Sequence, residues 1–230
     1  WFFSDKIAIA SMHAQEVGPQ DGGDFYRMVE ELARRAQLPM PRVYIAPHEA
    51  PNAFATGRSP SHAAVCVTQG ALKLLNRDEL EGVMAHELAH VKNRDTLTST
   101  IAASVAGVLA TIAQYGFLLG GSRREGTNPL VALFAMIFAA VGAALIKAAI
   151  SRSREFVADA DGAAIAGSPN GLMSALAKLE TYSQRIPMQQ PNPAMNNMFI
   201  VEPMMGRSLV NLFATHPPTE KRIEALSRLR

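Results

Sequence analysis

Two histidines and a glutamate stand at a spacing that suits a catalytic metal ion. The run HELAH, residues 86–90, sets His86 and His90 four residues apart, so on a helix both imidazoles lie on one face, one turn apart. Neutral imidazole is a good Zn²⁺ ligand. Glu87 can accept a proton from a zinc-activated water as that water attacks a carbonyl. The pattern predicts a zinc-dependent hydrolase with Glu87 as general base.

A catalytic zinc site needs a third protein ligand and keeps a fourth position open. The metzincin continuation is excluded, because no third histidine follows HELAH closely. The alternative is a carboxylate on a later helix, and Glu155 is the first candidate. Asp159, one turn beyond it, can accept a proton from a ligand histidine and so fix its tautomer. Asp161 and Glu180 are rival ligands, since spacing alone does not separate them from Glu155.

The HELAH run falls inside a helix that other residues indicate independently. Asn76 suits the N-cap position, and Glu79, three residues on, completes a capping box. The apolar stripe that follows predicts a helix to at least His90 and as far as Arg94. The preceding part of the chain predicts one helix and three short strands, over residues 24–36, 42–45, 53–55 and 63–68.

Two long stretches without charged side chains follow this helix. Residues 96–122 and 126–146 contain no Asp, Glu, Lys, Arg or His, and each reaches the ~20 residues that a helix needs to cross a hydrocarbon core. They predict a membrane hairpin, with a pair of buried core helices as the alternative. Two crossings return Glu155 to the side of HELAH, and basic residues on both flanks favour the cytoplasmic side, although the arginines at 123–124 oppose it.

The last part of the chain predicts more helices, over residues 151–166, 170–182 and 219–229. A Pro/Met-rich segment, 187–205, is either a lid over the cleft or a connector. The expected fold class is therefore α+β: a mostly helical domain with a small β-sheet and an inserted hydrophobic helical hairpin. We expect three parts, residues 1–95, 96–150 and 151–230, with the peptidase domain built from the first and third.

Composition excludes some function classes. The formal net charge is only +2, and no dense Lys/Arg run or phosphate-binding glycine loop is present, so nucleic acid is not an expected partner. Cys66 is the only cysteine, which fits a reducing compartment, and its apolar neighbours favour a buried small hydrophobe over a reactive thiol. The chain starts at Trp1 and reads as a fragment with an upstream part removed.

As a set, these motifs resemble the HtpX family of membrane metallopeptidases. The resemblance rests on HELAHVKNRD (86–95), the hydrophobic hairpin and SREFVADADG (153–162), together with WFFSDKIAI at the start and ATHPPTEKRI (214–223). It implies a zincin-like domain related to the CAAX prenyl proteases. One zinc ion per chain would be bound by His86, His90 and Glu155, with Glu87 as general base. It also implies two further N-terminal spans, which this sequence lacks.

The resemblance gives two more positions a role. Asn52 and Ala53 resemble an edge-strand motif that binds the substrate backbone as an added β-strand, although Asn52 is alternatively a turn residue after Pro51. His216 could stabilise the oxyanion of the tetrahedral intermediate, or it is a loop histidine fixed by the prolines beside it. Arg222 could orient either group.

The expected function is zinc-dependent endoproteolysis of unfolded or damaged membrane proteins, as part of quality control and the stress response. The expected location is the inner membrane, with several spans and the catalytic domain facing the cytoplasm. Polypeptides and the lipid bilayer are the expected partners. Two alternatives stay open: a specialised CAAX-type processing protease, and a zinc-stabilised scaffold or holdase without turnover.

Overall fold

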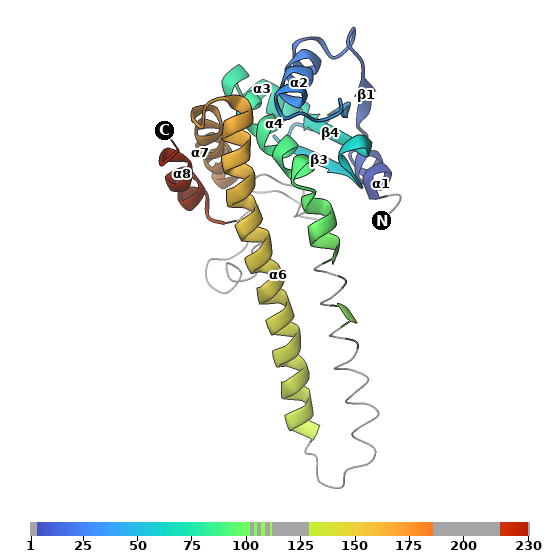
Figure 1. The fold of residues 1–230 in the computed structure, drawn as a ribbon, viewed down its shortest axis with the longest axis vertical. Coiled ribbons are helices and arrows are strands. Elements are labelled where there is room, and N and C mark those ends of the chain that lie inside the picture. Colours follow the sequence, from blue (N-terminus) through green and yellow to red (C-terminus); the bar gives the residue numbers. More distant parts are fainter. Residues whose placement is uncertain are drawn as a thin grey trace.

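The structure, a computed structural model of the 230-residue chain, describes residues 4–101, 104, 107–108, 111, 129–185 and 217–229. Segment 187–205, the arginines at 123–124 and His216 lie outside the described residues. The described part is mostly helical with one small mixed sheet (Figure 1). The expected α+β class is therefore confirmed, whereas the division into three parts stays a prediction.

The sheet has four strands in the order β1-β2-β4-β3. Its members are β1 (Gln15–Val17), β2 (Arg42–Ala46), β3 (Ala53–Gly57) and β4 (Ala63–Thr68). β2 and β4 run parallel, while β1 and β3 each pair antiparallel with their single neighbour. All six residues of β4 are buried, as expected for a central strand of apolar composition. β3 is an edge strand, so one side of its backbone is not paired within the sheet.

Helices surround this sheet, and α4 lies among them at the centre of the domain (Figure 1). They are α1 (Ser4–Ser11), α2 (Gly23–Arg35), α3 (Gln69–Leu74), α4 (Arg77–Lys92), α6 (Pro129–Ala166), α7 (Asn170–Arg185) and α8 (Thr219–Ser227), with a 3₁₀ turn at Pro60–His62. α4 packs against β3, α2, α6 and α7. Its fully buried Val83, Met84 and Leu88 join the core cluster that includes Val65 of β4 and Leu176 of α7. Each such side chain contributes about 1.5–3 kcal/mol by burial.

Small residues let α4 approach its neighbours closely. A Cβ added at Gly162 of α6 would lie 2.8 Å from the Cα of His86, and one at Gly82 would lie 2.4 Å from the backbone nitrogen of Leu172 in α7. Real Cβ atoms do not come so near to backbone atoms. These glycines therefore set the distance at which α6 and α7 pack on α4.

The expected helices and strands are found, with two corrections. The capping box is confirmed, because the Asn76 side chain accepts from Glu79 N and the Glu79 side chain accepts from Asn76 N, both at 2.9 Å. α4 ends at Lys92, so its expected extension to Arg94 is wrong: Asn93 and Arg94 form a turn, and a new helical segment begins at residue 95.

The second correction concerns the helix expected to begin at residue 151. α6 is one uninterrupted helix from Pro129 to Ala166. The polar residues that begin at 151 suggested a boundary, but no proline or glycine lies there to break the helix. Figure 1 shows the first half of α6 projecting away from the sheet and the second half packed beside α4. Within the described residues, no helix combines the length and apolarity needed to cross a membrane.

Candidate metal centre

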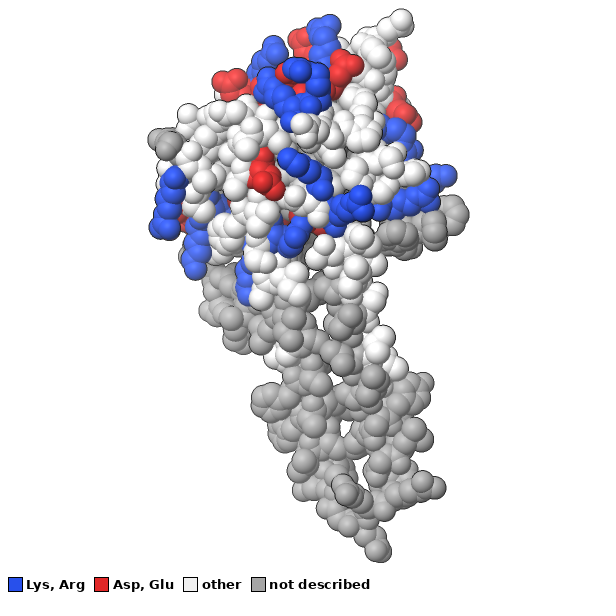
Figure 2. Space-filling view, in the orientation of Figure 1, with Lys and Arg blue, Asp and Glu red and all other residues white. Residues whose placement is uncertain are grey.

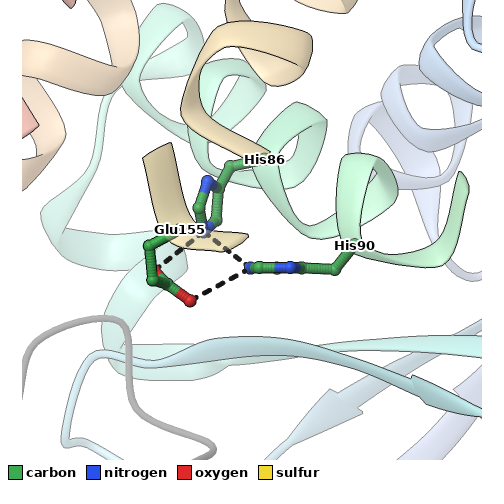
Figure 3. A group of neighbouring side chains, drawn as sticks. All are labelled: His86, His90 and Glu155. Carbon is green, nitrogen blue, oxygen red and sulfur yellow. Dashed lines mark hydrogen bonds and ion pairs between the residues drawn. The ribbon is translucent and has the colours of Figure 1, made fainter. Parts of the chain in front are cut away.

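Three candidate ligands from two helices converge at one point (Figure 3). His86 and His90 come from α4, where their spacing places them one turn apart, and Glu155 comes from α6. The Nε2 atoms of His86 and His90 are 3.1 Å apart. His86 Nε2 lies 3.7 Å from Glu155 Oε2, and His90 Nε2 lies 3.4 Å from Glu155 Oε1. Both imidazoles thus turn the same nitrogen toward the carboxylate.

This donor set fits a zinc ion. Ligand atoms at ~2.0–2.1 Å from a tetrahedral zinc lie about 3.4 Å from one another. The three separations, 3.1, 3.4 and 3.7 Å, bracket that value. Two imidazoles and one carboxylate also leave a fourth tetrahedral position for water or substrate. Figure 3 shows the three side chains grouped between the helices and the sheet.

His86 is oriented by a buried carboxylate and a buried arginine. Its Nδ1 lies 2.9 Å from Asp159 Oδ1, and Arg222 of α8 donates to both oxygens of Asp159, from Nε at 2.9 Å and from Nη2 at 2.6 Å. Burial raises the pKa of Asp159, but the hydrogen bonds from Arg222 and His86 lower it to about 2. A carboxylate at this position favours the tautomer of a ligand histidine that carries its proton on Nδ1 and presents Nε2 to a metal ion.

His90 is oriented by a second carboxylate, which sequence reasoning missed. Its Nδ1 lies 2.6 Å from Oδ2 of Asp95, a buried residue that follows the end of α4. Burial lowers the pKa of His90, but the carboxylates of Glu155 and Glu87 raise it overall above 6.5. Protons thus compete with a metal ion for this ring as the pH falls. The available signal was an acidic residue five positions after the second histidine of HELAH.

Glu87 lies between the ligand cluster and the sheet edge. Its Oε2 accepts a hydrogen bond from the backbone nitrogen of Ala55 in β3 at 2.9 Å, and the residue is 8% exposed. This bond ties the predicted general base to the strand predicted to bind substrate. Ala55 also lines a pocket beside the metal ligands, together with Gly57, His90 and Leu97.

The edge strand begins directly after Asn52. Asn52 is buried; its backbone nitrogen donates to Thr68 Oγ1 at 2.8 Å, and its carbonyl accepts from Thr68 N at 2.9 Å. Both backbone groups therefore point toward β4. Because hydrogen-bonded residues alternate along an antiparallel pair, the backbone groups of Ala53, Ala55 and Gly57 point the other way, toward the open edge.

The remaining sequence candidates lie away from the ligand cluster. Asp161 accepts from the Asn93 side chain at 2.7 Å, and Glu180 accepts from Thr219 Oγ1 at 2.9 Å, so neither rival joins His86 and His90. Burial raises the pKa of the Cys66 thiol to about 12, which agrees with the interpretation of this residue as a small core hydrophobe. His216 lies outside the described residues.

The sequence profile of peptidase family M48 matches residues 19–230. The chain belongs to this family. Its members include proteins named protease HtpX homolog, and three of them are close relatives of this M48 peptidase. The one from Desulforapulum autotrophicum is 52% identical over 233 residues, covering 98% of this chain and 75% of the relative. The one from Desulfatibacillum aliphaticivorans is 53% identical over 237 residues, covering 100% of this chain and 76% of the relative. The one from Pyrococcus furiosus is 50% identical over 234 residues, covering 100% of this chain and 81% of the relative.

A solved structure shares the fold of this M48 peptidase. The crystal structure of S. mikatae Ste24p superposes with a TM-score of 0.61 at 16% identity, over 97% of this chain and 56% of that one. This chain thus spans a little over half the length of Ste24p. Family membership and the His-His-Glu cluster confirm the predicted class, a zinc metallopeptidase with two histidines and a glutamate as metal-binding group. They also confirm the resemblance to HtpX.

Proposed function

We propose that this M48 peptidase is a membrane-anchored endopeptidase that hydrolyses peptide bonds in unfolded or damaged membrane proteins. The main support is the position of Glu87, which adjoins the metal-binding group and is hydrogen-bonded to the edge strand through Ala55 N at 2.9 Å. A site with only a structural zinc has no need for such a carboxylate. A catalytic site does, because a base must lie near the bond to be cleaved.

In this proposal His86, His90 and Glu155 hold one zinc ion per chain. Bound zinc would supply a Lewis acid that lowers the pKa of water and polarises the scissile carbonyl. Glu87 accepts the proton of the attacking water and passes it to the leaving amine. The Ala55 N–H holds one oxygen of Glu87, which limits the carboxylate to rotamers that face the cleft. Asp159 keeps His86 in the required tautomer from 2.9 Å.

The substrate would enter as an extended strand along β3. The outward backbone groups of Ala53, Ala55 and Gly57 offer the hydrogen bonds that such a strand needs. Asn52 would bind a substrate peptide group beside them. Main-chain pairing is insensitive to side-chain identity, which suits a protease that acts on unfolded polypeptides. Because Ala55 N already bonds Glu87, a substrate strand would pair here mainly through carbonyl groups and the neighbouring residues.

His216 is proposed to stabilise the oxyanion. It directly precedes Pro217 and Pro218, which lead into α8. From α8, Arg222 reaches the metal-binding group, with its Nη1 3.4 Å from Glu155 Oε2. The start of this helix therefore belongs to the same region of the molecule as the site. A donor at this position would act on the charge that develops on the carbonyl oxygen.

The anchor would be the segment 96–150. Apolar side chains on its described residues are exposed: Ile101 (55%), Val108 (57%), Ile137 (48%) and Val141 (38%). The basic residues Lys92 and Arg94 are exposed next to its start. Figure 2 shows Lys and Arg side chains in a band across the end of the domain from which α6 projects. A basic band beside an apolar projection matches the cytoplasmic face of a bilayer with anionic lipids.

Cleavage of a chemically unfolded reporter protein tests this function. The zinc-loaded chain in detergent should cleave the reporter, and the Glu87→Gln variant should bind zinc equally but cleave at least 100-fold more slowly, the usual scale for loss of a general base. Equal cleavage by both would point to a contaminating protease. Zinc binding without cleavage by either would favour the scaffold function.

A further inference from the structure

The carboxylate behind His90 reaches that ring only through an unusual backbone turn. Asp95 is five residues after His90, and on a continuous helix it would lie about 140° further round the axis. α4 instead ends at Lys92, and Arg94 adopts a left-handed conformation with φ +54°. A residue other than glycine is rarely found there, and such strain persists only where surrounding contacts determine it. The turn brings Asp95 Oδ2 to 2.6 Å from His90 Nδ1.

A second residue holds Asp95 in this place. Arg154 of α6 forms an ion pair with Asp95 Oδ1 through its Nη2, and the same nitrogen donates to the carbonyl oxygen of Asn93 at 3.1 Å. Arg154 therefore fixes both the carboxylate and the turn that carries it. It directly precedes the metal ligand Glu155 in α6, so one short stretch of α6 both supplies a ligand and contacts the turn that follows α4.

We propose that Asp95 and Arg154 are positioning residues of the metal centre, which link the zinc ligand His90 to both ends of the segment 96–150. The inference rests on the proposed zinc site. Asp95 accepts the Nδ1 proton of His90, which leaves Nε2 as the ligand atom. Arg154 holds Asp95 in its orientation toward His90. Because Asp95 lies just before the segment and Arg154 just after it, the pair also fixes the two ends of the segment against each other at the site.

The pair matches the arrangement behind His86. There Arg222 donates to Asp159, and Asp159 orients the ring. Each ligand histidine thus has its own carboxylate and its own arginine. The two sets differ in origin: one uses the C-terminal helix α8, and the other uses the two ends of segment 96–150. Loss of either carboxylate should weaken metal binding without removing a ligand, typically by about 10–100-fold for such outer partners.

Zinc release from the full chain tests the proposal. The variants Asp95→Asn and Arg154→Gln, loaded with zinc in detergent, are mixed with a chromophoric chelator, and the rate of zinc transfer is measured. We expect release about 10–100-fold faster than from the unchanged chain. The double variant should release zinc no faster than Asp95→Asn alone, because both residues act through one contact with His90. Release needs no turnover, so failure of the proposed peptidase activity would not affect this result.

Asp161→Asn is the matched control. Asp161 also joins the end of α4 to α6, by accepting from the Asn93 side chain at 2.7 Å, and the chemical change is the same. This variant should release zinc within about twofold of the unchanged chain, since no ligand contact is lost. The visible spectrum of the Co²⁺-loaded protein should shift for Asp95→Asn and not for Asp161→Asn, because it reports ligand geometry.

Two results would overturn the proposal. The first is release from Asp95→Asn at the unchanged rate, with an unchanged Co²⁺ spectrum. The second is equal acceleration in Asp161→Asn and Asp95→Asn, which would mean that any loosening of the α4–α6 contact acts in the same way. Thermal melting of the metal-free variants separates either result from a failure to fold.

Discussion

The metal-binding residues depend on buried charges that compensate one another. Glu155 and Asp159 are both buried, and so is the guanidinium of Arg222 that contacts them. An isolated buried charge would cost far more free energy than the protein's net stability. Here Arg222 donates hydrogen bonds to Asp159 and forms an ion pair with Glu155, so the cost is offset as long as every member stays in place.

Replacing Arg222 should therefore be strongly destabilising. In Arg222→Met the aliphatic volume is largely kept, but the buried carboxylate of Asp159 loses the guanidinium that donates to both of its oxygens. We expect a loss of about 3–5 kcal/mol in unfolding free energy, the range for breaking a buried pair by removing one partner. Thermal and denaturant unfolding of the detergent-solubilised chain would measure it.

Arg228→Met on the same helix serves as the control for that change. Arg228 pairs with Glu224 at the surface, where the two side chains are 74% and 63% exposed, and such pairs contribute little. Similar losses for both variants would show that α8 itself, and not the buried pair, is what the change disrupts.

Residue-level prediction succeeded where the signal was local and failed where it was tertiary. His86 and His90 could be placed in one metal-binding group because helical spacing alone brings them together. Glu155 could not be separated from its rivals, since its approach depends on how α6 packs. Asp95 was missed because its contact with His90 requires a left-handed turn at an arginine, which no residue type indicates in advance.

At the scale of elements, α4 is held at its N-terminal end by one glutamate. Glu79 accepts from Asn76 N at 2.9 Å, from Ser174 Oγ at 2.8 Å and from Lys178 Nζ at 2.5 Å. The capping box therefore also fastens α4 to α7. Burial raises the pKa of Glu79, but the hydrogen bonds from Lys178, Asn76 and Ser174 bring it below the ordinary 4.5 overall.

This shift predicts a pH-dependent contribution to stability. Because the pKa of Glu79 is lower in the folded chain than in the unfolded chain, its contribution is complete above about pH 4.5 and is lost as the pH falls through the folded pKa. Glu79→Gln should thus melt below the unchanged chain at pH 7, and the difference should shrink below pH 4.5. Melting curves across this range test it, and a difference that stays constant with pH would contradict the assignment.

The distance between α4 and α6 should control the metal site. A Cβ at Gly162 would lie 2.8 Å from the Cα and 2.9 Å from the backbone nitrogen of His86, so Gly162→Ala must push α6 outward and carry Glu155 away from the histidines. We expect at least tenfold weaker zinc binding, measured by competition with a chelator.

Gly142→Ala is the matched control on α6, because nothing lies within 4 Å of a Cβ at that position. Alanine favours a helix over glycine by about 1 kcal/mol, so this variant should keep zinc affinity and lose no stability. Weaker zinc binding in both variants would refute a role for close packing at His86.

Element boundaries were predicted where the chain marks them chemically. The start of α4 follows from its capping box, which local side chains form by themselves. The continuity of α6 past residue 150 was not predicted, because a change from apolar to polar side chains alters which face is buried but does not end a helix. The short α1, β1 and α3 were also not expected; they are eight, three and six residues long, too short for periodicity to show.

At the scale of the whole molecule, the site is assembled from parts of the chain that are far apart in sequence. The core cluster includes residues from α2, β4, α4, α7 and α8, and the metal-binding group comes from α4 and α6. Among the described residues, segment 96–150 contributes no ligand to this group. Its two ends, however, meet at Asp95 and Arg154 beside His90. The segment is thus separable from the chemistry except at its junctions.

This arrangement predicts that the anchor can be removed while the metal site is kept. Replacing residues 102–146 by a flexible Gly/Ser linker retains every ligand together with Asp95 and Arg154.

After expression in bacteria, the unchanged chain should stay in the membrane pellet after a carbonate wash. The shortened chain should appear in the supernatant and still bind one zinc ion per chain, measured by metal analysis after gel filtration. Removing the segment deletes the side chains that the proposed bilayer would cover and the charged residues between them, so folding should survive. A shortened chain that remains in the pellet without aggregating would place the anchor elsewhere. One that is soluble but binds no zinc would mean that the segment is needed to hold its two ends together at His90.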